Sequence, residues 1–397
     1  MNLRFVNAAL VRPNGVADGE LFVTGDTIVA HADDAQVIDC GGKLLAPAII
    51  DLGAFAVDPA ACRAGGIVRV ALMPDQSPVL DDPGIVRRAA TMGKPELWVH
   101  PLAAATRGLN GNDLAEMAIN ASAGARAVAT GRRWIACSGT MRRVLAYARD
   151  LNLTVVAHAE DAGLVGDAVA TDGLTATLHG LASAPAFAEA LAVARDLMLA
   201  EETGARLHIR QVTTAAALDL VRPAKRRGVA VTCGITPAHL LLSDIAVSDF
   251  RSFAHLSPPL RSERDRRACV AAVADGTIDV IASGHDPRGP EEKRLPFSDS
   301  APGMAGARTL LALALGIARD AELPMERLFT MLATTPARIL GLNAGTLEPN
   351  QPADLILFDD AAPWQIDATR HGNTPFDGLP VQGKVLRVWK GGREYGR

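Results

Sequence analysis

The stretch Ile67-Val68-Arg69-Val70-Ala71-Leu72 is a short apolar run of the kind that forms a buried strand. Similar runs recur along the chain, and helix-like sequence follows them: Glu96–His100, Thr154–Ala157, Arg206–Ile209, Val229–Thr232 and Asp279–Ala282. Repeated strand-then-helix units over this length are typical of an α/β fold, a parallel (β/α)₈ TIM-like barrel. Active sites of such barrels lie at the C-terminal ends of the strands, so candidate residues are sought there.

The two ends of the chain differ from this pattern. Both are rich in short strands and turns, as in Leu21–Asp26 and Ala353–Asp359. We expect residues 1–45 and 345–397 to pair into one small, β-sandwich-like domain. The barrel, residues 46–344, would then be inserted between its two halves.

Composition narrows the function classes. The 397 residues are 49% hydrophobic and 21% charged, with 40 basic against 44 acidic residues, so a folded protein without a nucleic-acid or anionic-membrane surface is expected. The apolar run Leu310–Ala318 is too short to span a bilayer and predicts a buried helix. The start of the chain lacks a signal-peptide pattern, and five scattered cysteines show no metal-binding spacing. We therefore expect a cytoplasmic protein with reduced, mostly buried cysteines.

Many short segments, in order along the chain, together resemble dihydroorotase of the amidohydrolase superfamily. They are 46–51, 73–78, 111–117, 156–161, 200–208, 236–240, 257–262 and 353–355. The resemblance covers nearly the whole chain and implies an amidohydrolase-type barrel with a small domain built from both termini. Because one fold hosts many functions, the site is read residue by residue.

In that family one or two zinc ions are held by a His-x-His pair at the end of the first barrel strand. The corresponding positions here are Gly53 and Phe55, and the family's substrate-binding arginine falls on Val57. Directly after Pro59 the chain reaches Ala64-Gly65-Gly66, which predicts a shortened first helix. The first strand has therefore lost both expected ligands.

The remaining ligand positions show the same loss. His158 is retained, but the ligating histidine of the next strand is Gln211 and the aspartate that serves as ligand and general base is Gly284. A bridging acidic residue or carboxylated lysine should lie near 128–131, where the sequence is Val-Ala-Thr-Gly. Glycine cannot take a proton from a metal-bound water.

A substitute for the lost aspartate is Asp286, two residues further on and on the same face if the strand continues. His158 and His285 offer two nitrogen ligands, fewer than the three of a usual catalytic zinc site. We therefore expect no catalytic residue, no metal and no other cofactor, with Asp286 as the rescue candidate.

Five residues are interpreted as relics of a ligand-binding site: His158, Arg261, His285, Asp75 and Ser257. Arg261 and His285 could bind an anion, or Arg261 could be structural and pair with Asp265 or a backbone carbonyl. Asp75 and Ser257 stand where the family has asparagines, and a carboxylate at 75 would repel an acidic ligand.

Three hypotheses follow. Bacterial proteins that resemble dihydroorotase but lack the metal ligands accompany aspartate carbamoyltransferase, so the first is a catalytically inactive structural or regulatory subunit of that enzyme. The second is an active cyclic-amide hydrolase with an atypical metal site. The third is a small-molecule binding module using His158, Arg261 and His285. In each case we expect a homo-oligomer.

Overall fold

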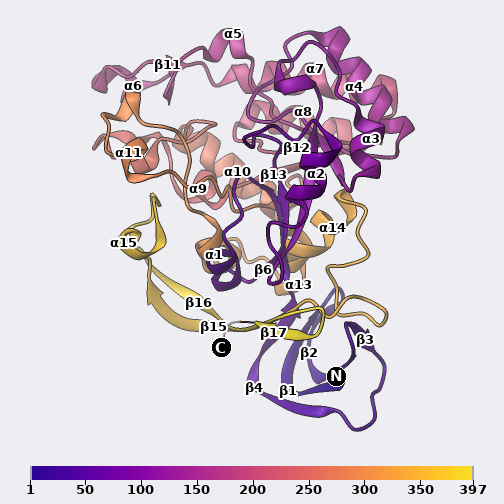
Figure 1. Cartoon of the computed structure of the whole chain (residues 1–397). Coiled ribbons are helices and arrows are strands. Elements are labelled where there is room, and N and C mark those ends of the chain that lie inside the picture. The colour runs from indigo at the N-terminus through magenta and orange to yellow at the C-terminus, as the bar shows by residue number, and fades with distance from the viewer. Residues whose placement is uncertain (1, 396–397) are drawn as a thin grey trace.

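Eight parallel strands form a nearly closed barrel in the computed structural model, which describes residues 2–395 (Figure 1). Their order around the barrel is β14 (Val280–Ile281), β13 (Val231–Ile235), β12 (Leu207–Ile209), β9 (Val155–Ala157), β8 (Ala127–Ala129), β7 (Trp98–Ala104), β6 (Ile67–Leu72) and β5 (Ile49–Ala54). The predicted α/β barrel is confirmed.

The barrel closes between β14 and β5 through polar contacts. The backbone N–H and hydroxyl of Ser283 donate to the Asp51 carboxylate at 2.8 and 2.5 Å, and the N–H of Phe55 donates to the carbonyl of His285 at 2.8 Å. Burial raises the pKa of Asp51, while the two Ser283 hydrogen bonds favour its charged form. The start and end of the barrel are thus held together beside the site.

Helices pack around the barrel, across its N-terminal end and beside the second sheet, and α12 is the buried helix expected from residues 310–318. They are α1 (Pro59–Ala64), α2 (Pro83–Ala89), α3 (Met117–Ser122), α4 (Ser138–Asp150), α5 (Ala162–Val165), α6 (Leu174–His179), α7 (Phe187–Thr203), α8 (Ala215–Arg226), α9 (Pro237–Leu241), α10 (Glu263–Asp275), α11 (Pro290–Lys293), α12 (Leu310–Asp320), α13 (Met325–Phe329), α14 (Thr335–Ile339) and α15 (Ala368–His371). The first helix has six residues, as the shortened sequence predicts. Among residues 2–395 no helix has the length and apolarity needed to cross a bilayer.

The second sheet is mixed and contains strands from both ends of the chain (Figure 1). Its order is β17 (Arg393–Tyr395), β16 (Pro380–Lys390), β15 (Leu355–Gln365), β4 (Gln36–Pro47), β1 (Asn2–Arg12), β2 (Gly15–Thr24) and β3 (Thr27–Val29). In its core the Phe5 and Trp389 rings form a T-shaped pair with centroids 4.9 Å apart. A buried ion pair between Arg69 of β6 and Asp354, 2.6 Å long, joins this sheet to the barrel.

The barrel interior is apolar at one end and polar at the other. Ile50, Leu52, Ala71 and Leu102 lie in a buried cluster with Ala337, Ile339 and Leu340 of α14 and the residues after it, which close the N-terminal end. The polar side chains gather at the C-terminal strand ends, where barrel sites are expected.

Candidate functional site

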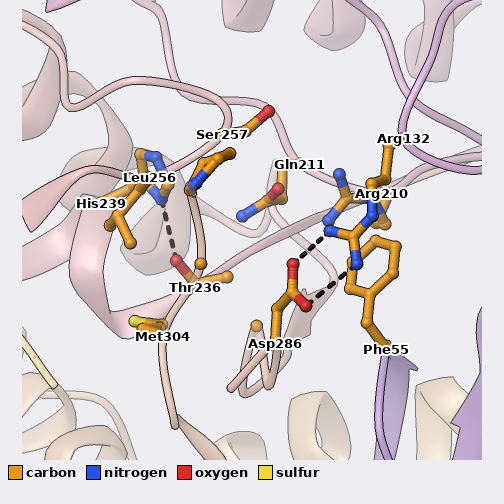
Figure 2. Close-up of a pocket in the computed structure, with 13 residues that line it drawn as sticks. Phe55, Arg132, Arg210, Gln211, Thr236, His239, Leu256, Ser257, Asp286 and Met304 are labelled. Atoms are coloured by element: carbon orange, nitrogen blue, oxygen red, sulfur yellow. Dashed lines mark hydrogen bonds and ion pairs between the residues drawn. The ribbon is translucent and has the colours of Figure 1, made fainter. Parts of the chain in front are cut away.

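A small pocket lies at the C-terminal ends of the barrel strands, and we call it the floor pocket. Its lining is shown in Figure 2 and consists of Phe55, Arg132, Arg210, Gln211, Thr236, His239, Leu256, Ser257, Gly284, Asp286, Pro302, Gly303 and Met304. Its volume is about 30 Å³, room for one or two water molecules. The space is therefore nearly filled by protein.

Asp286, the rescue candidate, is bound on both carboxylate oxygens. Oδ1 accepts from Arg132 Nη2 at 2.9 Å and Oδ2 accepts from Arg132 Nη1 (Figure 2). Arg288 Nη2 also donates to Oδ2, at 3.0 Å. Strand β14 ends at Ile281, so the condition for Asp286 to replace the lost aspartate, a strand that continues to it, is not met. Guanidinium donors from Arg132 and Arg288 therefore occupy both oxygens of this carboxylate.

Arg210 follows β12 directly and turns into the barrel mouth. The residue is 6% exposed, its Nη2 lies 3.3 Å from His158 Nδ1, and its Nε has no hydrogen-bond partner within residues 2–395. Burial lowers its pKa to about 10, so the group is charged at neutral pH. A permanent cation thus occupies the mouth of the barrel.

The Phe55 ring lies against two guanidinium groups, with Arg132 Cζ 3.8 Å and Arg210 Cζ 5.1 Å from its centroid (Figure 2). Cations over an aromatic face are attracted by the ring's negative quadrupole, more strongly where water is excluded. Phe55 is 8% exposed and lies one residue past the end of β5. The expected ligand position is therefore occupied by a packed hydrophobic ring.

Two of the expected ligand positions have backbones that disfavour side chains. Gly53 sits at a β-bulge with φ +102°, and a Cβ there would meet Arg210 Cδ at 3.4 Å. Gly284 has φ +61°, and a Cβ there would lie 2.8 Å from Thr236 Cγ2. Replacing either glycine requires neighbours or backbone to shift.

His158 uses both ring nitrogens. Its Nδ1 faces Arg210 and its Nε2 lies 3.3 Å from Glu160 Oε2, while its backbone N–H donates to the hydroxyl of Thr130 at 2.9 Å. Thr130 belongs to segment 128–131, where the family resemblance implies a bridging ligand. Because a guanidinium can only donate, His158 Nδ1 accepts, and the Nε2–H points at the Glu160 carboxylate.

Arg261 is a buried structural residue within the described chain. It donates to Glu160 Oε1 at 2.5 Å, to Glu189 at 3.4 Å and to the hydroxyls of Thr213 and Thr171. Burial raises the pKa of Glu160, but the hydrogen bond with His158 and the charge of Arg261 outweigh it and lower that pKa to about 2.

The proposed partner of Arg261 has a different role. Asp265 accepts from the Ala215 N–H at 2.9 Å and from the Ser262 hydroxyl at 2.6 Å, at the starts of α8 and α10. The suggested Arg261–Asp265 pair is therefore replaced by the pairs with Glu160 and Glu189. Glu189 lies inside α7, and its Oε1 also accepts a hydrogen bond from the backbone N–H of Thr213 at 2.8 Å.

The remaining candidates are spread over separate places. His285 Nδ1 accepts from the Ala307 N–H at 3.3 Å, burial lowers the histidine's pKa, and its Nε2 has no partner within residues 2–395. Asp75 Oδ1 accepts from the Arg132 N–H at 2.9 Å. Ser257 lines both the floor pocket and an adjoining outer pocket of about 400 Å³, which His158 and Glu160 also line. The five proposed relics do not converge on one point.

The residues present do not fit a catalytic zinc ion. No group of three or more His, Cys, Asp or Glu side chains among residues 2–395 is arranged to hold a metal. Both nitrogens of His158 are engaged, and the charge of Arg210 beside them repels a cation. We assign no chemical step to a metal here.

Sequence reasoning missed Arg132 and Arg210. Both stand next to positions that were inspected for lost ligands, 128–131 and 211. The available signal was a basic residue within three residues of a strand end. The partner that gives Arg132 its role lies 154 residues away in the sequence.

Comparison with known proteins identifies the family. The Amidohydrolase family model matches residues 107–395. A dihydroorotase of Citrifermentans bemidjiense is 36% identical over 395 residues, covering 95% of this chain and 93% of the relative, and one of Pelobacter propionicus is 35% identical, covering 99% of each. This chain is a dihydroorotase-family amidohydrolase.

Among solved structures, the L-hydantoinase of Arthrobacter aurescens superposes with a TM-score of 0.87 at 22% identity, covering 99% of this chain and 95% of the hydantoinase, which confirms the fold. The family resemblance of the sequence is thus confirmed, while the site of this dihydroorotase-family member departs from the metal-binding pattern.

Proposed function

We propose that this chain is a dihydroorotase-like protein of pyrimidine biosynthesis that lacks dihydroorotase activity and acts in the cytoplasm as a structural or regulatory subunit of aspartate carbamoyltransferase. One observation carries the non-catalytic part: the charged Arg210 side chain lies between His158 and Gly53, against the Phe55 ring. The partner is supported by the resemblance to bacterial proteins without metal ligands that accompany that enzyme.

Hydrolysis of a cyclic amide needs an activated water and a group that accepts its proton. The carboxylate of Asp286 is held by Arg132 and Arg288, and Gly284 offers no side chain. The floor pocket of about 30 Å³ is also too small for a ring-shaped substrate. These features support a structural or regulatory role for the folded chain over a catalytic role for the site.

Size-exclusion chromatography with light scattering tests the partner. This chain and aspartate carbamoyltransferase from the same organism are run separately and mixed at micromolar concentrations, with carbamoyltransferase activity assayed across the fractions. We expect co-elution at a higher mass and a change in that activity. Independent elution with unchanged activity would contradict the proposal.

The outer pocket favours a second candidate, a small-molecule binding module. Its volume of about 400 Å³ is within the size of ligand sites, and Arg132, His158 and Ser257 line it. Thermal unfolding with millimolar dihydroorotate tests this candidate. A concentration-dependent rise in Tm that Arg132→Gln removes would support it, and an unchanged Tm would count against it.

A further inference from the structure

A further pocket lies between helix α12 and strands β15 and β16 of the second sheet, and we call it the α12–β16 pocket. Helix α15, which joins those two strands, closes it on one side (Figure 1). Its volume is about 560 Å³, within the size of small-molecule sites. The residues that give it chemical character are Arg308, Leu311, Trp364, Arg370, His371 and Lys384. It shares no residue with the floor pocket or the outer pocket.

Arg308 lies in the turn before α12 and is half-buried. Within residues 2–395 its guanidinium has no hydrogen bond or ion pair. Arg195 and Arg222 are half-buried too, but Arg195 binds Asp196 at 2.5 Å and Arg222 binds Asp219 at 2.9 Å. A charge that loses part of its hydration is stabilised by a partner of opposite charge. The Arg308 guanidinium is therefore available to an anion in the pocket.

Two more cations line the same space. Lys384 is exposed, and its cross-strand neighbour Asp359 binds Lys43 at 2.5 Å instead. Arg370 pairs with Asp367 at 3.4 Å, and its side chain remains 81% exposed. Asp367 is the acidic residue of the described lining, which thus holds three cationic side chains against one carboxylate. The surplus is two positive charges.

An aromatic side chain forms a rigid part of the wall. The Nε1–H of Trp364 donates to the carbonyl of Gly383 at 2.8 Å, and its ring makes a T-shaped pair with His371, with centroids 5.7 Å apart. Burial lowers the pKa of His371 and the charge of Arg308 lowers it further, so this imidazole is neutral at pH 7 and adds no charge. Leu311 adds apolar surface. Such a wall suits stacking with a planar ring.

The charge and the apolar surface together indicate a ligand class. Guanidinium groups bind phosphate through paired N–H···O bonds, and an ammonium group adds a point charge. A phosphate monoester carries a charge of about −1.5 to −2 at pH 7, which matches the surplus of the lining. A single carboxylate would leave one positive charge uncompensated.

We propose that the α12–β16 pocket binds a phosphate monoester that carries an aromatic ring, a mononucleotide being a simple example. The phosphate would lie among Arg308, Arg370 and Lys384, with the ring against Trp364. The pocket is separate from the barrel mouth. The inference therefore stands or fails independently of the proposals on the carbamoyltransferase and on the outer pocket.

Isothermal titration calorimetry of the full chain tests this site, with adenosine monophosphate and phenyl phosphate as probes. Both should bind with one molecule per chain. Arg308→Gln and Lys384→Gln should each weaken binding about 10-fold, because each removes a charge-assisted hydrogen bond. Trp364→Leu should weaken both probes but leave the affinity for inorganic phosphate unchanged. Arg319→Gln on α12, outside this lining, is the control for the loss of one positive charge.

Far-UV circular dichroism and Tm establish that each variant is folded. Failure of both probes to bind the wild type at about 10 mM would overturn the proposal. So would binding that Arg308→Gln and Lys384→Gln leave unchanged, or that Arg319→Gln weakens equally. Adenosine that binds as tightly as its monophosphate would refute the role of the phosphate, and unchanged binding in Trp364→Leu would refute that of the ring. Binding that only the pocket variants weaken would support the proposal.

Discussion

Arg210 Nη2 lies 3.3 Å from His158 Nδ1, so the retained histidine directs its lone pair at a guanidinium. The other ring nitrogen faces Glu160 at 3.3 Å, and Glu160 in turn binds Arg261. Both ring nitrogens of His158 therefore have a partner within the protein. The site is therefore organised around fixed cations and their carboxylates.

Phe55→Ala should lower the free energy of unfolding by about 3–5 kcal/mol, because removal of a buried ring leaves a cavity that its neighbours fill only in part. The ring is 8% exposed and lies against Arg132 and Arg210. Urea denaturation measures the change, and Phe55→Leu should cost less. A loss below about 1 kcal/mol would mean that the mouth is open and hydrated.

Gly53→Ala should destabilise the fold by about 1–3 kcal/mol, the usual cost of backbone strain at a positive φ. The φ of Gly53 is +102°, and the added Cβ would meet Arg210 Cδ at 3.4 Å. Gly316→Ala in α12 is the control, because nothing lies within 4 Å of its Cβ position; it should stabilise by about 0.5–1 kcal/mol. Equal stability of the two variants in urea would refute the strain argument.

Restoring the first two ligand positions, Gly53→His with Phe55→His, should leave dihydroorotate hydrolysis undetectable in the presence of zinc. Gln211 and Gly284 still lack the required donors, and Arg210 still occupies the mouth. Adding Gly284→Asp should not help, since its Cβ would lie 2.8 Å from Thr236 Cγ2. Chelator-sensitive hydrolysis by the double variant would disprove this prediction.

Glu160 should make stability depend on acid pH. Its folded-state pKa of about 2 is below its ordinary value of 4.5, so its contribution is full above about pH 5 and is lost as the pH falls toward 2. The stability advantage of wild type over Glu160→Gln should shrink across that window. Glu263→Gln is the control: its pKa is also about 2, but its side chain is 41% exposed and its ion pairs are screened, so little difference is expected. Parallel pH curves for wild type and Glu160→Gln would contradict the assignment.

The barrel could be predicted from sequence because short apolar runs mark buried parallel strands. Strand β6 has the predicted bounds, residues 67–72. The predicted strand at 96–100 is β7, displaced to 98–104, because its continuation past Pro101 is alanine-rich and carries a weak strand signal. The three-residue β8 went unassigned for the same reason.

For the site, the sequence predicts only which metal ligands of the family are missing. Absent ligands at 53, 55, 211 and 284 are visible in the sequence, whereas the arginines that fill the space depend on contacts between distant segments. Arg261 illustrates this: the sequence suggests Asp265 or a backbone carbonyl as its partner, but the barrel brings Glu160 and Glu189 to it. Burial then favours those partners, since each charge needs a counter-charge.

Zinc content tests the central claim most directly. Wild type and His158→Ala are each expressed and dialysed with zinc supplied and then freed of loosely bound metal. Elemental mass spectrometry measures the zinc content of each protein. We expect well under one zinc per chain in both proteins. One zinc per chain in the wild type that is lost in His158→Ala would contradict it.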